Sequence, residues 1–229
     1  MIKFFRHIRK SLLMENKTGK YLKYAIGEII LVVLGILIAL NINSWNEARK
    51  KDIAEKEFIE GVKNDLRQDK QYIELVIKNI NPKIKAYNFL NKELPELYEK
   101  DKNTLDSISQ IYFVSQRTFY QISGSFQAAI SGNEINTYKN KEATRAIIKL
   151  YNSTYARLVD NGEMLDGRWD YICRKYNYER RTGHFHEMNS KQIFGLLDDM
   201  YYHFIQMQWY QKMLLETVVE IDALLQQNQ

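Results

Sequence analysis

Apolar side chains recur at steps of three and four residues through most of the chain, the spacing that places them on one face of an α-helix. One stripe of such positions runs from Ile193 to Leu225, and a second runs from Ile59 to Leu94. A stripe of this length packs along an equally long partner, so we expect the two segments to pair as antiparallel helices. No stretch alternates between apolar and polar residues for long enough to predict a sheet.

Shorter helical patterns lie between the two stripes, over residues 104–113, 118–130, 140–158 and 164–176. Asn140 is of a type that caps helix N-termini, so a helix is expected to begin there. Proline disrupts the interior of a helix, which predicts a kink at Asn81-Pro82 and an end near Pro95. Asn161-Gly162 predicts a turn or a kink, and residues 180–189 predict a polar loop.

Residues 25–42 form an apolar run, AIGEIILVVLGILIALNI, that is interrupted only by Glu28 and Asn41. With the aromatic residues on both sides, the run reaches the ~20 residues that a bilayer requires. The alternative interpretation is a cleaved signal peptide. The long basic region before the run and the lack of a small-x-small cleavage site after it favour an uncleaved transmembrane helix at residues 25–45.

These patterns predict an all-α fold, in which one N-terminal transmembrane helix continues into an antiparallel bundle of long helices. The chain then divides into a basic head (residues 1–24), the transmembrane helix (residues 25–45) and a helical domain (residues 46–229).

The charge is distributed unevenly over these parts. The formal net charge is +5, but the excess of Lys and Arg lies in residues 1–24, and the rest of the chain is nearly neutral. A nearly neutral domain argues against nucleic acid as a partner. The positive-inside rule places the head in the cytoplasm and residues 46–229 across the membrane. The head is either an interfacial helix resting on membrane lipid or an ordinary basic flank.

Four residues of the transmembrane helix are candidates for packing or coupling: Glu28, Gly35, Ala39 and Asn43. Gly35 and Ala39 have the small-xxx-small spacing that lets two membrane helices approach closely. Glu28 is a carboxylate near the headgroups, where it can pair with a lysine. Helix packing, no specific role, and an ion or proton role for Glu28 all remain open.

Motifs for catalysis or cofactor binding are absent from the sequence. His184, His186 and Glu187 are spaced so that they can hold a metal ion, with Cys173 as a distant candidate, but no second pair of ligands is visible. We favour a solvated loop there, and we expect no metal, no cofactor and no enzymatic activity. Cys173 is the single cysteine, which excludes an intrachain disulfide.

Aromatic residues are dense near the C-terminus, and the chain contains 16 tyrosines. Four aromatic residues cover more than one face of the last helix and are candidates for an interaction surface: Tyr201, Tyr202, Trp209 and Tyr210. Tyr and Trp favour half-buried contacts and protein interfaces. The alternative interpretation is a broad helix–helix core with hydroxyl groups at its rim.

Two stretches, KYAIGEIILVVLGILIALNINSWNE and SGNEINTYKNKEATRAIIKLYN, resemble the bacterial single-pass membrane family known as domain of unknown function 6090. In the second stretch Gly132, Asn140 and Glu142 fit the family's pattern, whereas Ala143 stands where a larger aliphatic residue is usual. The resemblance implies a Gram-negative inner membrane, with the bulk of the chain in the periplasm. It implies no activity.

We therefore expect a membrane-anchored periplasmic interaction or scaffold protein that acts with a protein partner or as a homo-oligomer. The second hypothesis is an envelope sensor or energy-coupling accessory that works with a multi-pass partner through Glu28. An enzyme of unrecognised type is the third.

Overall fold

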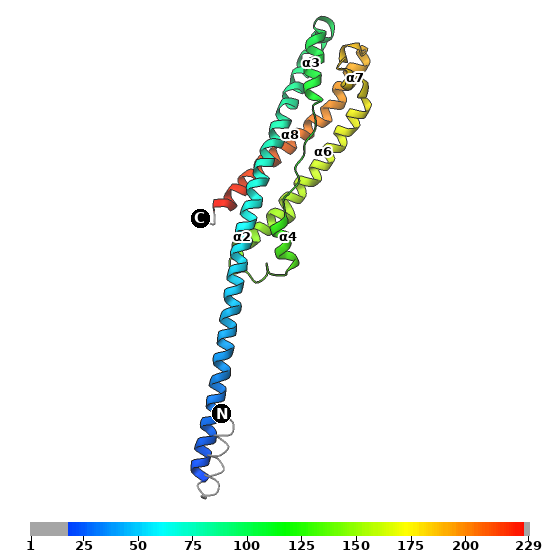
Figure 1. The fold of residues 1–229 in the computed structure, drawn as a ribbon. Helices are drawn as coiled ribbons and strands as arrows, with labels where there is room; N and C mark the ends of the chain where they lie inside the picture. Colours follow the sequence, from blue (N-terminus) through cyan, green and yellow to red (C-terminus); the bar gives the residue numbers. More distant parts are fainter. Residues whose placement is uncertain (1–17, 227–229) are drawn as a thin grey trace. The chain divides into compact units, whose positions relative to one another are not determined.

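The computed structural model describes residues 18–226, and all secondary structure within that range is helical (Figure 1). The elements are α2 (Thr18–Lys100), α3 (Lys102–Tyr112), α4 (Gly124–Ser131), α5 (Lys141–Lys149), the π-helix η1 (Leu150–Tyr155), α6 (Ala156–Lys175), α7 (Asn177–Thr182), the 3₁₀-helix η2 (Phe185–Glu187) and α8 (Ser190–Gln226). The predicted all-α fold is confirmed. The chain divides into two compact units, which meet in sequence between Ala54 and Glu55.

The first unit contains the N-terminal part of α2. This helix is long and apolar enough to cross a membrane, and its large apolar side chains from Leu22 to Trp45 are all exposed. A polar side chain within the segment is satisfied locally, because Asn41 Nδ2 donates to the Leu37 carbonyl oxygen at 3.1 Å. Apolar surface of this extent is unfavourable in water, so the segment is suited to an apolar environment.

In the second unit, α2 and α8 form an antiparallel pair, as the two long stripes predict. Three contacts give the register: Lys70 Nζ with Asp222 Oδ1 at 2.6 Å, Gln211 Nε2 with Asn81 Oδ1 at 2.5 Å, and Tyr98 Oη with the Met188 carbonyl oxygen at 2.9 Å. Positions that ascend along α2 therefore meet positions that descend along α8. The apolar stripes of both helices are buried.

A second antiparallel pair joins α8 to α6. Lys175 Nζ contacts Asp199 Oδ2 at 2.6 Å, and near the opposite end of the pair Thr154 Oγ1, in η1, donates to Glu220 Oε2 at 2.9 Å. Between these contacts, Gly162 lies against the Tyr210 hydroxyl. Helix α8 therefore contributes buried side chains to interfaces with both α2 and α6.

The segment between α3 and α4, residues 114–123, is not helical, and we call it the strap. It is visible in Figure 1 as the extended green coil between these two helices. A buried backbone without secondary structure needs other hydrogen-bond partners. Side chains from α2 and α8 supply them: Asn79 Nδ2 donates to the Ser115 carbonyl oxygen (3.0 Å), Tyr72 Oη to the Thr118 carbonyl oxygen (3.2 Å), the Phe119 N–H to Tyr210 Oη (2.8 Å) and the Ile122 N–H to Asp69 Oδ1 (2.9 Å).

The structure differs from four local expectations. Helix α2 contains both prolines and ends at Lys100, so the predicted end near Pro95 is wrong; burial of Leu94 and Leu97 offsets the lost hydrogen bond. The predicted helix at 118–130 is only α4, because the strap takes its first half. Helix α6 runs through Asn161-Gly162 without a turn. Residues 180–189 include the end of α7 and all of η2.

Other local expectations are confirmed. The predicted helix at 104–113 is α3, which begins slightly earlier, at Lys102, with Asp101 as its N-cap. Asn140 caps α5, since its side-chain oxygen accepts from the Ala143 N–H at 3.0 Å. The cap is itself held by Glu55, whose two carboxylate oxygens accept from the backbone N–H groups of Lys139 and Asn140 at 2.8 Å and 2.7 Å.

Candidate functional site

A lysine is buried in the second unit. Lys83, on α2, is 0% exposed, and its Nζ donates to Gln116 Oε1 of the strap at 3.0 Å. The same Nζ lies 3.4 Å from the centre of the Trp169 ring of α6, and in the described part of the chain it forms no ion pair. Burial disfavours the charged form and lowers the pKa of Lys83 to about 7.

An aromatic cluster holds Trp169 in place. Its ring centroid is 5.6 Å from that of Phe113, 6.2 Å from that of Tyr112 and 5.3 Å from that of His203, on which it is stacked. His203 is fully buried, and its Nδ1 is hydrogen-bonded to the Tyr112 hydroxyl at 2.7 Å. Burial, reinforced by Lys83 and Arg168, lowers the pKa of His203 to about 3, so the imidazole is neutral at physiological pH.

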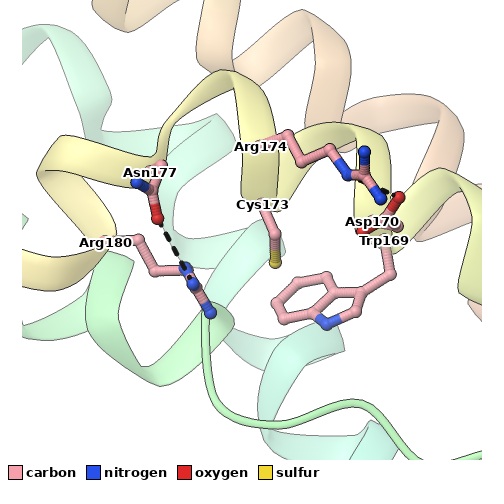
Figure 2. Close-up of a pocket in the computed structure, with 6 residues that line it drawn as sticks. All are labelled: Trp169, Asp170, Cys173, Arg174, Asn177 and Arg180. Carbon is pink, nitrogen blue, oxygen red and sulfur yellow. Dashed lines mark hydrogen bonds and ion pairs between the residues drawn. The ribbon is translucent and has the colours of Figure 1, made fainter.

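A pocket of about 490 Å³ opens beside this cluster (Figure 2). It is lined by the last turns of α6 and by α7, through Trp169, Asp170, Cys173, Arg174, Asn177 and Arg180. Arg174 Nε is paired with Asp170 Oδ2 at 2.8 Å, whereas Arg180 Nη2 is 3.5 Å from Asn177 Oδ1. Figure 2 shows the Cys173 sulfur pointing between Trp169 and Arg180.

Cys173 is poorly suited to nucleophilic chemistry. Burial raises the pKa of its thiol above the ordinary value, and this outweighs the opposite effects of Arg180 and Lys83. The reactive form of cysteine is the thiolate, which is scarce at neutral pH under these conditions. The thiol therefore acts as a neutral, weakly polar part of the pocket.

Two carboxylates from α2 lie under the strap. Asp69 is fully buried and accepts from the Ile122 N–H, and Asp65 Oδ2 accepts from the Ser125 N–H at 3.1 Å. Burial, with repulsion from Asp65, raises the pKa of Asp69 to about 6, although the Ile122 N–H and Tyr155 act in the opposite direction. This pair fastens α2 to the strap and to the start of α4.

The histidine segment forms pairs rather than a metal cluster. His186 Nδ1 is 2.5 Å from Asp106 Oδ2, and its backbone N–H donates to Asp106 Oδ1 at 2.9 Å. His184 Nδ1 is 3.3 Å from Glu187 Oε1. Among the described residues, no group of three or more His, Cys, Asp or Glu side chains is placed to hold a metal ion.

The four C-terminal aromatic candidates separate into two groups. Tyr201, Tyr202 and Trp209 are 45%, 62% and 64% exposed. Tyr210 is 1% exposed, and its hydroxyl accepts from the strap, so it belongs to the core and not to a surface. The reason is helical geometry, since adjacent residues point about 100° apart and only one of them can face α6 and the strap.

The candidates of the predicted transmembrane segment all lie on α2 in the first unit. Gly35, Ala39 and Asn43 are exposed and recur every four residues, and Glu28 is half-buried. A Cβ placed on Gly35 would meet no atom within 4 Å. This face is open to a neighbouring helix.

Residues 28–199 match a family of unknown function, DUF6090. The chain belongs to this family. The DUF6090 match covers the buried lysine, the acidic pair, the strap and the pocket, and it ends before Trp209. No curated protein and no solved structure matches the chain.

Sequence reasoning missed the buried charges of this DUF6090 protein. Lys83 occupies a stripe position, three residues after Ile80 and four before Tyr87, and Asp69 occupies another between Val62 and Ile73. A charged residue at a core-facing position is costly unless it has partners. That mismatch between residue type and position is the signal that would have found both.

Proposed function

We propose that this protein is a membrane-anchored helical interaction protein that binds another protein through an aromatic ridge. The ridge consists of Tyr171 on α6 together with Tyr201, Tyr202 and Trp209 on α8. The observation that carries the proposal is that a basic side chain lies beside three of these exposed rings. Arg168 is 5.8 Å from the Tyr202 ring, Lys175 is 5.7 Å from the Tyr171 ring and Lys212 is 6.0 Å from the Trp209 ring.

The ridge spans the neighbouring helices α6 and α8. Tyr202 and Trp209 are two helical turns apart on α8, and Arg168 reaches across from α6 to the Tyr202 ring. The Tyr201 and Tyr202 ring centroids are 5.6 Å apart, which makes the surface continuous on the α8 side. Tyr, Trp and Arg are the residues that most often dominate the energetics of protein interfaces.

The basic side chains define the chemistry of the partner. A partner surface that presents carboxylates beside aliphatic side chains would pair with Arg168 and Lys212 while it covers the rings. In the free protein these lysines remain solvated, so their charge carries little desolvation cost. Their electrostatic attraction to the rings and to a partner becomes stronger when the partner excludes water.

The exposed apolar segment of α2 supports anchoring in a membrane. The excess of basic residues before it favours a cytoplasmic head and, in a Gram-negative bacterium, a periplasmic helical unit attached to the inner membrane. A partner in the same compartment or membrane would then be met at high local concentration.

Affinity purification tests the proposal, using full-length tagged protein extracted from membranes with mild detergent. In a separate preparation, a photo-crosslinking residue at position 202 identifies what the ridge contacts. We expect a defined protein to be crosslinked and co-purified. The variants Tyr202→Ala and Trp209→Ala should reduce its recovery at least tenfold, because removal of a central aromatic at an interface typically costs more than ~1.4 kcal/mol.

Tyr178→Ala is the matched control, since Tyr178 is an exposed tyrosine on α7 outside the ridge. It should leave recovery of the partner unchanged. Equal recovery with all three variants, or crosslinks at position 202 to lipid and detergent alone, would overturn the proposal.

A further inference from the structure

We propose that the pocket of Figure 2 binds a small organic carboxylate, held by Arg180 and by the charge of Lys83, whose Nζ lies against the Trp169 ring that lines the pocket. This site is separate from the aromatic ridge, and the inference adds a small-molecule ligand to the protein partner proposed above. The inference rests on how the charges and the apolar surfaces around the pocket are arranged.

Positive charge exceeds negative charge around the pocket. Asp170 is engaged with Arg174, and within residues 18–226 the side chain of Arg180 is held only by a long contact to the neutral Asn177 side chain. Guanidinium groups bind carboxylates through paired N–H donors, a geometry that Arg180 is free to offer. An anion in the pocket would therefore meet a cation that has no strong competitor.

Lys83 adds a second cation from the core side. Its Nζ lies on the face of Trp169, a pocket-lining residue, and it is near enough to Cys173 for each group to shift the pKa of the other. The groups that face Lys83 are Cys173 and Asp166 of α6, His203 of α8 and the Gln116 amide of the strap. Asp166 accepts a hydrogen bond from Thr118, and no carboxylate forms an ion pair with Lys83 in the described part of the chain.

The shape and lining indicate an organic anion rather than a bare ion. A volume of about 490 Å³ lies within the range of small-molecule sites. Trp169 and the protonated Cys173 thiol give the pocket an apolar and weakly polar part of its lining, and Arg174 and Arg180 give it a basic part. A ligand with an apolar body and one carboxylate would place each part against a matching surface.

Binding of such an anion would be coupled to a proton. The pKa of Lys83 is about 7 in the free protein, so near neutral pH a substantial fraction of the amine is uncharged. A carboxylate nearby stabilises the ammonium form, and the complex therefore takes up a proton onto Lys83 Nζ. Affinity should decrease as the pH rises above 7, since the ammonium then has to be formed at a greater cost.

Isothermal titration calorimetry on the full-length protein in detergent micelles tests the inference, with benzoate, indole-3-acetate, hexanoate and succinate as probes. We expect at least one to bind with a dissociation constant below ~10 mM, and its neutral amide to bind at least tenfold more weakly. Titration at pH 7.5 in buffers of different ionisation enthalpy should reveal proton uptake.

Arg180→Gln should weaken binding about tenfold or more, and Arg181→Gln is the matched control on the same helix, where no change is expected. Lys83→Met should abolish the proton uptake while the thermal midpoint shows that the protein remains folded. The inference is overturned if none of the four carboxylates binds, if the amide binds as well as the acid, if inorganic phosphate binds equally well, or if the two arginine variants behave alike.

Discussion

Lys83 and Trp169 form a cation–π pair between α2 and α6, with the lysine Nζ 3.4 Å from the centre of the indole ring. The two residues are far apart in sequence, and Trp169 also lines the pocket. A desolvated cation–π contact contributes about 2 kcal/mol, which is less than the several kcal/mol that burial of an ammonium group costs. The lowered pKa of Lys83 is the visible result of that imbalance.

Replacement of this lysine should therefore stabilise the protein. Lys83→Met keeps an unbranched side chain of similar length and removes the buried charge, so we expect unfolding at pH 7 to become less favourable by roughly 1–3 kcal/mol. The pH dependence gives a second test. The folded-state pKa of about 7 lies below the ~10.4 of an unfolded lysine, so the unfolded state holds more protons between these values and wild-type stability rises with pH there.

Thermal unfolding followed by circular dichroism between pH 7 and pH 10 measures both effects. Lys83→Met should lack the increase in stability with pH that Lys83 contributes to the wild type. Lys78→Met, at an exposed position of α2, should retain that increase. A variant that is less stable than wild type at pH 7 would show that the cation–π pair outweighs the burial.

Asp69 should respond to pH in the direction opposite to an ordinary paired carboxylate. Its folded-state pKa of about 6 lies above the ~3.9 of unfolded aspartate, so its contribution to stability is fully present below about pH 4 and is lost as the pH rises through 6. Asp69→Asn removes the charge and keeps an acceptor for the Ile122 N–H. We expect it to stabilise the protein by roughly 1–3 kcal/mol at pH 7.5 and to have little effect at pH 4.

Asp69→Ala separates the charge from the hydrogen bond. It also removes the charge, but it leaves the Ile122 N–H without its acceptor, which costs ~1–3 kcal/mol. At pH 7.5 the alanine variant should be less stable than the asparagine variant in urea or thermal unfolding. Equal stabilities would mean that the strap takes another partner when Asp69 is lost.

His203 should oppose Asp69 in the same pH window. Its folded-state pKa of about 3 lies below the ~6.5 of unfolded histidine, so the unfolded state binds a proton first and stability falls on acidification from about 6.5. This loss of stability amounts to about 1.4 kcal/mol per pH unit, and His203→Phe should remove it. The difference between variant and wild type, measured by urea unfolding from pH 7 to pH 4, should grow in favour of the variant. A constant difference would place the imidazole in contact with water.

The organisation of the fold could be predicted from the sequence because it follows from periodicity. The stripes of α2 and α8 predict an antiparallel pair, and Asn140 marks the start of α5. The strap could not be predicted in this way. Its conformation depends on hydrogen bonds to side chains such as Asp69 and Tyr210, which lie 53 and 91 residues away from their partners.

The candidate site was beyond sequence reasoning for a related reason. The stripe places Lys83 at a core-facing position, but the sequence does not indicate that Gln116 and Trp169, from two other segments, contact its side chain. Trp209 and Tyr210 are adjacent and both aromatic, so composition does not decide which of them is buried. The burial of Tyr210 depends on the strap, because the Tyr210 hydroxyl accepts from the Phe119 N–H.

Alanine substitutions at two glycines of α6 test how tightly the strap is packed. A Cβ on Gly162 would lie 3.0 Å from Tyr210 Oη and 3.2 Å from Thr118 Cβ, whereas a Cβ on Gly167 would meet no atom within 4 Å. Gly167→Ala should stabilise α6 by ~0.5–1 kcal/mol, the ordinary helix-propensity gain. Gly162→Ala gains the same propensity, but it displaces the Tyr210 hydroxyl from the strap, and overpacking costs ~1–3 kcal/mol. We therefore expect Gly167→Ala to raise the thermal midpoint and Gly162→Ala to lower it, although both add one methyl group to the same helix. A stabilising Gly162→Ala would mean that the strap shifts to make room for the added methyl group.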